Sequence, residues 1–467
     1  EFHVSGEKGA EKLFFHTGQL YREGRIEQSG HDYTIRLDNL PSKRGVELHA
    51  YWPRTDFASA MDQGLKGNRL EEFNKIEDSI VREKEQRKYL VTWVVPLISS
   101  LSLLLSICFY FIYKRKTSPS VKYAKNHRLY EPPMELEPMV LSEAVYSTSL
   151  EEVSPLIKGA GKFDFNQLIQ ATLLDVIDRG NVSIISEGDA VTLRLVKEDG
   201  LESFERTCLN LAFSGKKEVA VSDLFADYKV SESLYRGAKA TDEKRIQTKG
   251  RKLKYSFERA LKEMQEGVKD RVSFLGIPAY YRPLTSGEKV LQVSMGVSTI
   301  FPLIIGFGLF LYSLDVHGYL YLPLPVLGSL GLILAVFYYW KIRLDNRDGV
   351  LNEVGAEVYY LWTSFENMLR EIARLDQAEL ESIVVWNRLL VYATLFGYAD
   401  KVSHLMKVHQ IQVENPDINL YVAYGWHSMF YHSTAQMSHY ASVANTASTF
   451  SVSSGSGSSG GGFSGGG

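Results

Sequence analysis

Residues 89–113 read YLVTWVVPLISSLSLLLSICFYFIY, a stretch of about 25 residues without a charged side chain. A helix of this length, rising about 1.5 Å per residue, crosses the roughly 30 Å hydrocarbon core of a bilayer. Lys114, Arg115 and Lys116 follow it directly. The stretch therefore predicts a transmembrane helix over residues 89–113.

Two further apolar segments, residues 290–314 and 318–340, are each long enough to span a membrane. Only Asp315, Val316 and His317 separate them, which predicts a tight helical hairpin. Buried helices of a soluble protein are the alternative, and three uncharged runs of this length disfavour it.

Basic residues beside the spans predict their orientation. Lys114, Arg115 and Lys116 follow the first span, Lys341 and Arg343 follow the third, and the hairpin tip has neither Lys nor Arg. This pattern places residues 114–289 and the C-terminal part inside the cell, and the N-terminal part outside. Four residues before the first span favour the opposite orientation: Arg82, Lys84, Arg87 and Lys88. Five aromatic residues are expected in interfacial belts: Tyr110, Tyr113, Tyr338, Tyr339 and Trp340.

Residues 1–56 predict part of an outer β-sandwich-like domain. Residues 33–37 and 46–52 alternate apolar with polar side chains, as half-buried strands do, and Pro41 and Gly45 mark a turn between them. The chain begins Glu1-Phe2, without Met or a signal peptide, so we expect a processed or truncated form that holds only the C-terminal part of this domain.

Residues 57–88 predict a juxtamembrane stalk helix with a narrow apolar stripe formed by Leu70, Phe73, Ile76 and Ile80. The stalk either transmits a signal or is a spacer that packs on its own domain, and the pattern favours the spacer.

Residues 114–289 predict a cytosolic winged-helix-like region. A helix over residues 163–179 begins at Asp164, a good N-cap, and ends at Gly180. Residues 182–185 and 191–195 then form a β-hairpin. Segments at 204–213, 219–228 and 255–271 suggest a second, degenerate winged module.

Residues 341–411 predict a cytosolic helical pair, over 355–375 and 380–408, and residues 412–467 predict a disordered tail rich in Ser and Gly. The predicted fold class is thus a membrane α+β protein with three transmembrane helices, a partial outer β domain, winged-helix-like modules and a C-terminal helical pair.

This order of parts resembles the YciQ-like predicted membrane proteins of bacteria, the DUF2207 family. Residues 33–41 with 46–53 resemble the end of the family's outer β domain, and Glu131-Pro132-Pro133 its first cytosolic residues. Three further stretches carry the resemblance: Leu173-Leu174-Asp175, Arg179-Gly180-Asn181-Val182 and the WNRLLVYATLFGYA run over 386–399. The resemblance implies a multi-pass protein of the bacterial plasma membrane and no reaction.

A basic run is the one candidate binding site, consisting of Lys244, Arg245, Lys249, Arg251, Lys252 and Lys254. Such a run can bind anionic lipid headgroups, at about 1 kcal/mol per residue near the surface, or nucleic acid. A solvated loop and helix face is the favoured interpretation, followed by lipid, with nucleic acid least favoured.

Other motifs predict no chemistry. Gly159-Ala160-Gly161-Lys162 lacks the residues that a phosphate-binding loop needs at Leu156 and Phe163. Five histidines between His404 and His439 have spacings that suit no common metal site. We therefore expect no enzyme, metal, cofactor or small-molecule substrate.

The predicted function is a scaffold or signal-relay protein that binds protein partners and the lipid bilayer. Two alternatives remain open: a membrane-tethered winged-helix DNA-binding regulator, and an accessory subunit of a transport or envelope-assembly complex.

Overall fold

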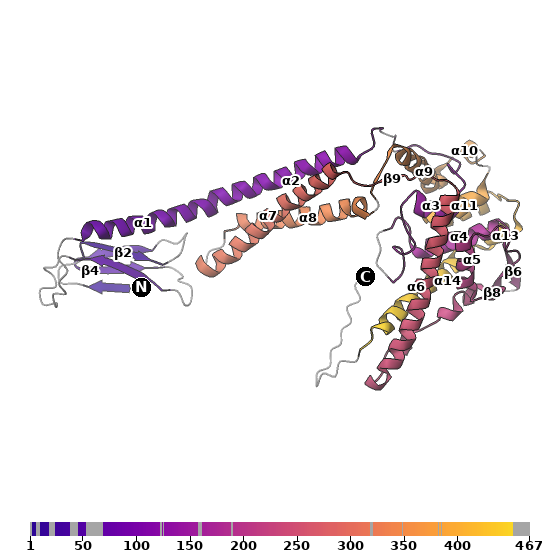
Figure 1. The fold of residues 1–467 in the computed structure, drawn as a ribbon, viewed down its shortest axis with the longest axis horizontal. Coiled ribbons are helices and arrows are strands. Elements are labelled where there is room, and N and C mark those ends of the chain that lie inside the picture. Colours follow the sequence, from indigo (N-terminus) through magenta and orange to yellow (C-terminus); the bar gives the residue numbers. More distant parts are fainter. Residues whose placement is uncertain are drawn as a thin grey trace. The chain divides into compact units, whose positions relative to one another are not determined.

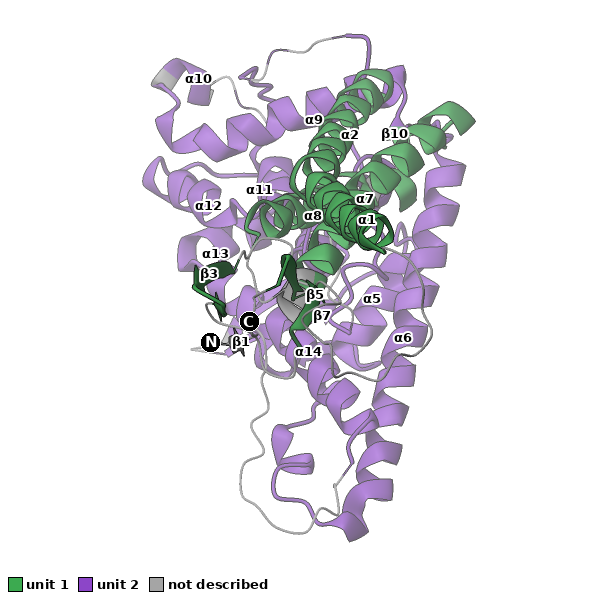
Figure 2. Cartoon of the chain, turned by 90° about the vertical axis from the view of Figure 1, so that its left-hand side faces the viewer, with its two compact units in different colours: residues 1–118, 283–350 green, residues 119–282, 351–467 purple. Residues whose placement is uncertain are grey.

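The computed structural model describes residues 2–5, 10–17, 24–37, 45–52, 69–121, 124, 126–156, 161–187, 190–317, 321–347, 349–381, 383 and 385–451. The chain forms two compact units (Figure 2). Unit 1 comprises residues 1–118 and 283–350, and unit 2 comprises residues 119–282 and 351–467. The chain passes between them three times: after residue 118, after the short strand β9 (Tyr281–Arg282) and within the short strand β10 (Val350–Leu351).

Five short strands open unit 1: β1 (Phe2–Ser5), β2 (Lys12–His16), β3 (Arg25–Ser29), β4 (Asp32–Arg36) and β5 (Glu47–Tyr51). They form two antiparallel sheets, with orders β1-β4-β3 and β2-β5. The two predicted strands exist as β4 and β5, and Tyr33 and Ile35 of β4 are buried as their alternation predicts. However, β4 and β5 lie in different sheets, because each pairs with an upstream strand that the sequence pattern did not reveal.

One continuous helix follows the strands, made of α1 (Leu70–Tyr89), the π-helical turn η2 (Leu90–Val94) and α2 (Val95–Thr117) (Figure 1). The part of the predicted stalk that the structure describes as helix, residues 70–88, is therefore joined to the first span without a break, and residues 57–68 of the stalk lie outside the described residues. The start of α1 packs on the β2-β5 sheet, where the Phe73 ring lies 6.0 Å from that of Phe14 and 5.8 Å from that of Tyr51. The helix is thus anchored on the strands of its own unit.

The predicted apolar stripe of this helix is shifted in the structure. Ile76 is 50 % exposed, whereas the neighbouring Glu77 is only 3 % exposed. The buried carboxylate is tolerated because two histidine side chains contact it, a contribution that apolar periodicity does not reveal.

The spans α7 (Ser286–His317) and α8 (Pro323–Arg347) complete unit 1. Together with α2, they are long and apolar enough to cross a membrane, as predicted. Small residues allow α7 and α8 to approach closely: a Cβ added at Gly306 would lie 2.7 Å from the carbonyl oxygen of Leu324. Such contacts are typical of packed transmembrane helices, where dispersion replaces the hydrophobic effect.

Two of the five aromatic residues expected in interfacial belts, Tyr113 and Tyr338, are buried among the three helices, whereas Tyr339 and Trp340 are about 60 % exposed. The buried tyrosines bring their hydroxyl groups to interhelical hydrogen bonds and so pack the bundle. The position of the five residues relative to a membrane surface stays a prediction.

Unit 2 contains the predicted helix and hairpin as α4 (Phe165–Asp178), β6 (Val182–Glu187) and β7 (Ala190–Leu195). Asp164 and Gln167 form a capping box at the start of α4, and Gly180 adopts the left-handed conformation (φ +70°) that ends it. The short helix α3 (Pro138–Ala144) precedes them, and α5 (Ser203–Phe213) and β8 (Glu218–Ala220) follow.

The strand of the predicted second winged module belongs to the same sheet as the hairpin of the first. β8 pairs with β7, so the three strands β6-β7-β8 form one sheet. Four 3-10 turns lead from this sheet to the long helix α6 (Glu243–Phe274): η3 (Val221–Asp223), η4 (Ala226–Tyr228), η5 (Glu232–Leu234) and η6 (Ala240–Asp242). The winged-helix assignment itself stays a prediction.

The predicted C-terminal pair is wrong in its second member. The first helix is α9 (Glu353–Glu371), followed by the turn η7 (Ile372–Arg374). The segment predicted as one helix over 380–408 contains α10 (Gln377–Glu381), α11 (Trp386–Phe396) and α12 (Ala399–Val408). Gly397, at φ +79°, ends α11 and turns the chain toward α12.

The prediction of disorder is wrong for the first part of residues 412–467. Here the chain forms α13 (Pro416–Tyr424) and α14 (His427–Ser448), and α14 packs against α6 and α4. Its buried face is built from Phe430, Met437, Ala441, Ala444 and Ala447 with small hydroxyl residues, a composition that also occurs in loops. Residues 452–467, which hold the Ser/Gly repeat, lie outside the described residues.

Candidate functional site

The basic run forms the N-terminal part of α6. Lys244, Arg245, Lys249, Arg251 and Lys252 are exposed there, and Lys254 is half-buried. The opposite face carries the buried Ile246 and Gly250, and Gly250 packs against Ala447 and Ser448 of α14. The structure thus confirms a charged helix face and brings all six cations onto one element.

Acidic neighbours balance only part of this charge. Arg245 lies 3.4 Å from Asp242, and Lys254 lies 3.9 Å from Glu258. Within the described residues, Lys244, Lys249 and Lys252 form no ion pair. Cations near a helix N-terminus oppose the helix dipole, so the basic run does not stabilise α6 through that dipole.

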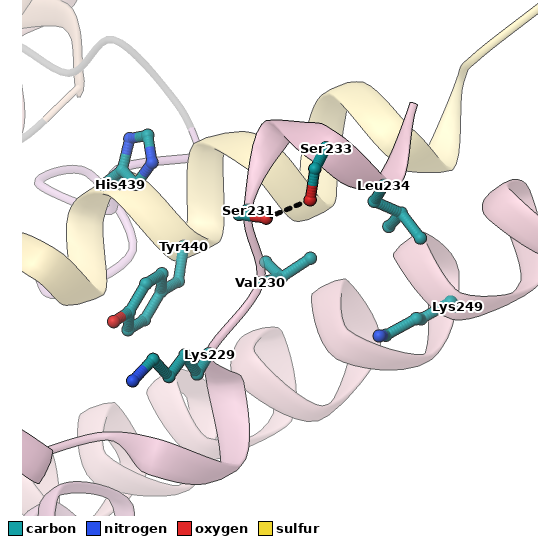
Figure 3. A pocket seen from close by; sticks show the side chains of 8 residues that line it. All are labelled: Lys229, Val230, Ser231, Ser233, Leu234, Lys249, His439 and Tyr440. Carbon is teal, nitrogen blue, oxygen red and sulfur yellow. Dashed lines mark hydrogen bonds between the residues drawn. The ribbon is translucent and has the colours of Figure 1, made fainter. Parts of the chain in front are cut away.

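A pocket of about 480 Å³ opens beside this face (Figure 3). α6 contributes Lys249, α14 contributes His439 and Tyr440, and the segment between η4 and η5 contributes Lys229 and Ser231. The Oγ atoms of Ser231 and Ser233 lie 2.5 Å apart, and Tyr440 donates a hydrogen bond to Gln436 at 3.0 Å. Two lysines and a histidine on an open pocket suit an anionic group more than a cation.

A second hollow of about 630 Å³ contains Lys252 and Arg259 on one wall. Asp227 and Glu263 line the same hollow, and Arg259 donates a hydrogen bond to Glu263 at 2.8 Å. Its charge is therefore mixed, and it lacks the positive character of the pocket beside Lys249.

The helix that precedes the hairpin offers no surface for reading DNA. Residues 168–177 of α4 are all buried, since α4 packs against α3, α11 and α14. A recognition helix must expose one face to the major groove, which α4 does not do. The geometry of α4 therefore gives the DNA-regulator alternative no support.

A buried ionic network joins α4 to α11 and α5. Arg388 of α11 pairs with Asp175 of α4, and it also donates a hydrogen bond to the Tyr392 hydroxyl at 3.2 Å. Arg179 pairs with both Asp175 and Glu205. Burial raises the pKa of Glu205 to about 7, and this effect outweighs the opposing attraction of Arg179.

This network connects the stretches that resemble the family. Asp175 and Arg179 belong to the stretches over 173–175 and 179–182, and Arg388 belongs to the WNRLLVYATLFGYA run. Stretches more than 200 residues apart are thus held together by one charged cluster. The network has a structural role, because its groups satisfy one another inside the core.

The basic residues that predict orientation lie at the ends of α2 and α8, and these two ends contact each other. Lys114 of α2 lies 3.1 Å from Asp345 of α8, and the Tyr113 hydroxyl donates to the same carboxylate at 2.8 Å. Gln292, near the start of α7, donates to Tyr113 at 3.0 Å. Arg115 and Lys116 are exposed beside them, Arg343 is half-buried, and the Lys341 ammonium lies 5.9 Å from the Phe337 ring centre.

The end of α2, the start of α7 and the end of α8 therefore lie on the same side of the bundle, as a three-span topology requires. Which side of the membrane this is stays a prediction.

Sequence analysis missed a cluster of two histidines and a carboxylate in unit 1. His16 Nε2 lies 2.9 Å from Glu77 Oε2, and His49 Nδ1 contacts Glu77 Oε1. The hydrogen bond with Glu77 raises the pKa of His49. The three residues are far apart in the sequence and belong to no short motif. Predicting that they meet would have required knowing that β2 pairs with β5, and in which register.

Comparison with known proteins supports one assignment. The family model DUF2207_C, described as the C-terminal domain of predicted membrane proteins, matches residues 126–406. No curated protein matches the chain, and no solved structure matches it.

Proposed function

Because the chain belongs to the DUF2207 family of predicted membrane proteins, we propose that it is a signal-relay protein of the bacterial plasma membrane. In this proposal the strands of unit 1 lie outside the cell, unit 2 lies inside, and protein partners bind on one or both sides. The chain acts by binding and transmission, and not by catalysis or transport.

The observation that carries the proposal is the unbroken helix over residues 70–117. At about 1.5 Å per residue its ends are roughly 70 Å apart. One end packs on the β2-β5 sheet through Phe73 and Glu77. The other end contacts the two remaining spans through Tyr113 and Lys114. A helix held at both ends can convert a change in the strands into a shift of the helix bundle.

The test uses distances between spin labels in the full chain, reconstituted in lipid discs. Cys108→Ser and Cys208→Ala remove the native thiols, and labels are placed at Ile112 on α2 and Asn346 on α8. Phe73→Ala then breaks the contact with Phe14 and Tyr51. The matched control is Val81→Ala, which truncates an exposed side chain on the same helix.

A relay predicts that Phe73→Ala changes the distance distribution between the labels and that Val81→Ala does not. Two glycines inserted after Lys88 should abolish the effect of Phe73→Ala, because they uncouple α1 from α2. Identical distributions for the parent and Phe73→Ala would overturn the proposal.

A second candidate function is binding of anionic lipid headgroups by the basic run. Lys244, Lys249 and Lys252, which lack ion pairs within the described residues, favour it. An environment-sensitive dye at Thr248 on the full chain should respond to phosphatidylserine in the vesicle and lose this response in the K244Q/K249Q/K252Q variant. Lys269→Gln, at an exposed lysine further along α6, is the control. A response to short duplex DNA instead of the anionic lipid would favour the regulator alternative.

A further inference from the structure

The cluster of His16, His49 and Glu77 lies where β2, β5 and α1 meet. Antiparallel pairing places Phe14 opposite His49 and His16 opposite Glu47, so these side chains share the sheet face that α1 covers. Phe73 and Glu77 are one helical turn apart on α1, so the same face of the helix presents an aromatic ring and then a carboxylate. The His16 and His49 rings lie edge to face, with their centres 4.9 Å apart.

The donor atoms are close enough to share one ion. One ligand atom from each of the three residues lies within 4.8 Å of the others. Two donors held about 2.1 Å from a tetrahedral zinc ion lie roughly 3.4 Å apart. Both histidines must therefore move away from the carboxylate on binding: His16 Nε2 starts 2.9 Å from Glu77 Oε2, and His49 Nδ1, which is closer to Glu77 Oε1, moves further. Two imidazoles and one carboxylate are a ligand set that zinc and related divalent transition metals accept.

The surroundings of His49 add a second, independent feature of metal sites. Its Nδ1 faces Glu77, while its Nε2 lies 3.1 Å from the Glu47 carboxylate. A metal-bound histidine usually donates its other ring N–H to a carboxylate, which fixes the tautomer and strengthens the ligand. Glu47 occupies this outer position.

The three side chains of the cluster differ in their exposure to solvent. The Glu77 side chain is 4 % exposed, whereas the side chains of His16 and His49 are 20 % and 23 % exposed. The carboxylate is thus fixed beneath the imidazoles, and solvent reaches the cluster from the imidazole side. The described residues supply three ligands, which leaves a coordination position for water or another ligand.

We propose that His16, His49 and Glu77 bind one divalent transition-metal ion, with zinc as the best-matched representative, and that Glu47 orients His49. The ion would connect both strands of the β2-β5 sheet to the helix that continues into the membrane. Metal binding at this site does not depend on the relay, because all three ligands belong to β2, β5 and α1 and none to the other spans.

The test is zinc titration of the full chain in detergent, after chelator treatment, at pH 8 and without a polyhistidine tag. Calorimetry should give one ion per chain, and cobalt in place of zinc should give a visible absorption band that reports its coordination. His16→Gln, His49→Gln and Glu77→Gln should each lose this site. Glu47→Gln should weaken binding by about 10–100-fold, the usual effect of removing such an outer partner.

Two matched controls keep the test specific, since the chain has 11 histidines. His31→Gln changes an exposed histidine in the turn between β3 and β4, and Glu27→Gln changes a carboxylate on β3 that pairs with Arg36 at 3.7 Å. Both should bind as the parent does. If Glu77→Gln fails to fold, the two histidine variants decide the result. Zinc binding that all three ligand variants retain, or no binding by the parent, would overturn the proposal.

Discussion

Ser106 Oγ lies 2.6 Å from Thr299 Oγ1, a hydrogen bond between two membrane spans whose residues are 193 positions apart. Ser106 is fully buried, and its hydroxyl also lies 3.2 Å from that of Tyr338 on the third span. This hydroxyl group of α2 therefore contacts both of the other spans, α7 and α8.

Ser106→Ala should lower the stability of the bundle by about 0.6 kcal/mol and by at most about 1.7 kcal/mol, the range for hydrogen bonds between membrane helices. Ser329→Ala is the matched control, since Ser329 is exposed and, among the described residues, donates a hydrogen bond only within its own helix, to the Pro325 carbonyl oxygen at 2.8 Å. Unfolding in mixed micelles measures both. Equal losses for the two variants would contradict the interhelical role of Ser106.

Gly250→Ala should loosen α14 from α6. A Cβ at this position would lie 2.5 Å from the Ser448 backbone nitrogen, which cannot move without shifting the helix. We expect a loss of about 1–3 kcal/mol, the usual cost of overpacking. Limited proteolysis should then cleave within residues 427–448 sooner than in the parent. Thr248→Ala, at an exposed position of the same helix, should change neither measurement.

Arg388→Gln should destabilise unit 2 by about 3–5 kcal/mol, because it removes one of the two arginines that pair with the buried Asp175 carboxylate. Adding Asp175→Asn should restore part of this loss, which a double-mutant cycle by thermal unfolding would detect. Arg374→Gln, at an exposed arginine, should stay within about 0.5 kcal/mol of the parent. Simple additivity of the two buried changes would argue against the pairing.

Glu205 should make stability fall as the pH rises toward neutrality. Burial raises its pKa from 4.5 to about 7, so between these values the folded chain binds the proton more tightly than the unfolded chain. The stabilisation is complete below about pH 4.5 and is lost as the pH rises through about 7.

Glu205→Gln removes this dependence. The melting temperature of the variant minus that of the parent should therefore become more positive as the pH rises from 5 to 8. Glu218→Gln, which changes an exposed carboxylate, is the control. A constant difference for Glu205→Gln across this range would show that the group titrates as an ordinary carboxyl.

Elements that depend on neighbouring residues could be predicted from the amino-acid sequence. Three uncharged runs predicted the spans, because hydrocarbon excludes charge over a fixed thickness. Asp164 and Gly180 predicted the ends of α4, because capping depends on neighbouring residues. The alternation of apolar and polar side chains predicted β4 and β5, because it is set by residues that are neighbours in the sequence.

Features that depend on a partner far away in the chain became visible only in the folded protein. Tyr113 and Tyr338 point into the bundle because other helices supply hydrogen-bond partners. α14 is ordered because its small residues fit against α6. Glu77 is buried because strand register brings His16 and His49 to it, 61 and 28 residues away along the chain. Composition and periodicity record only the preferences of a segment, whereas these contacts depend on which segments meet.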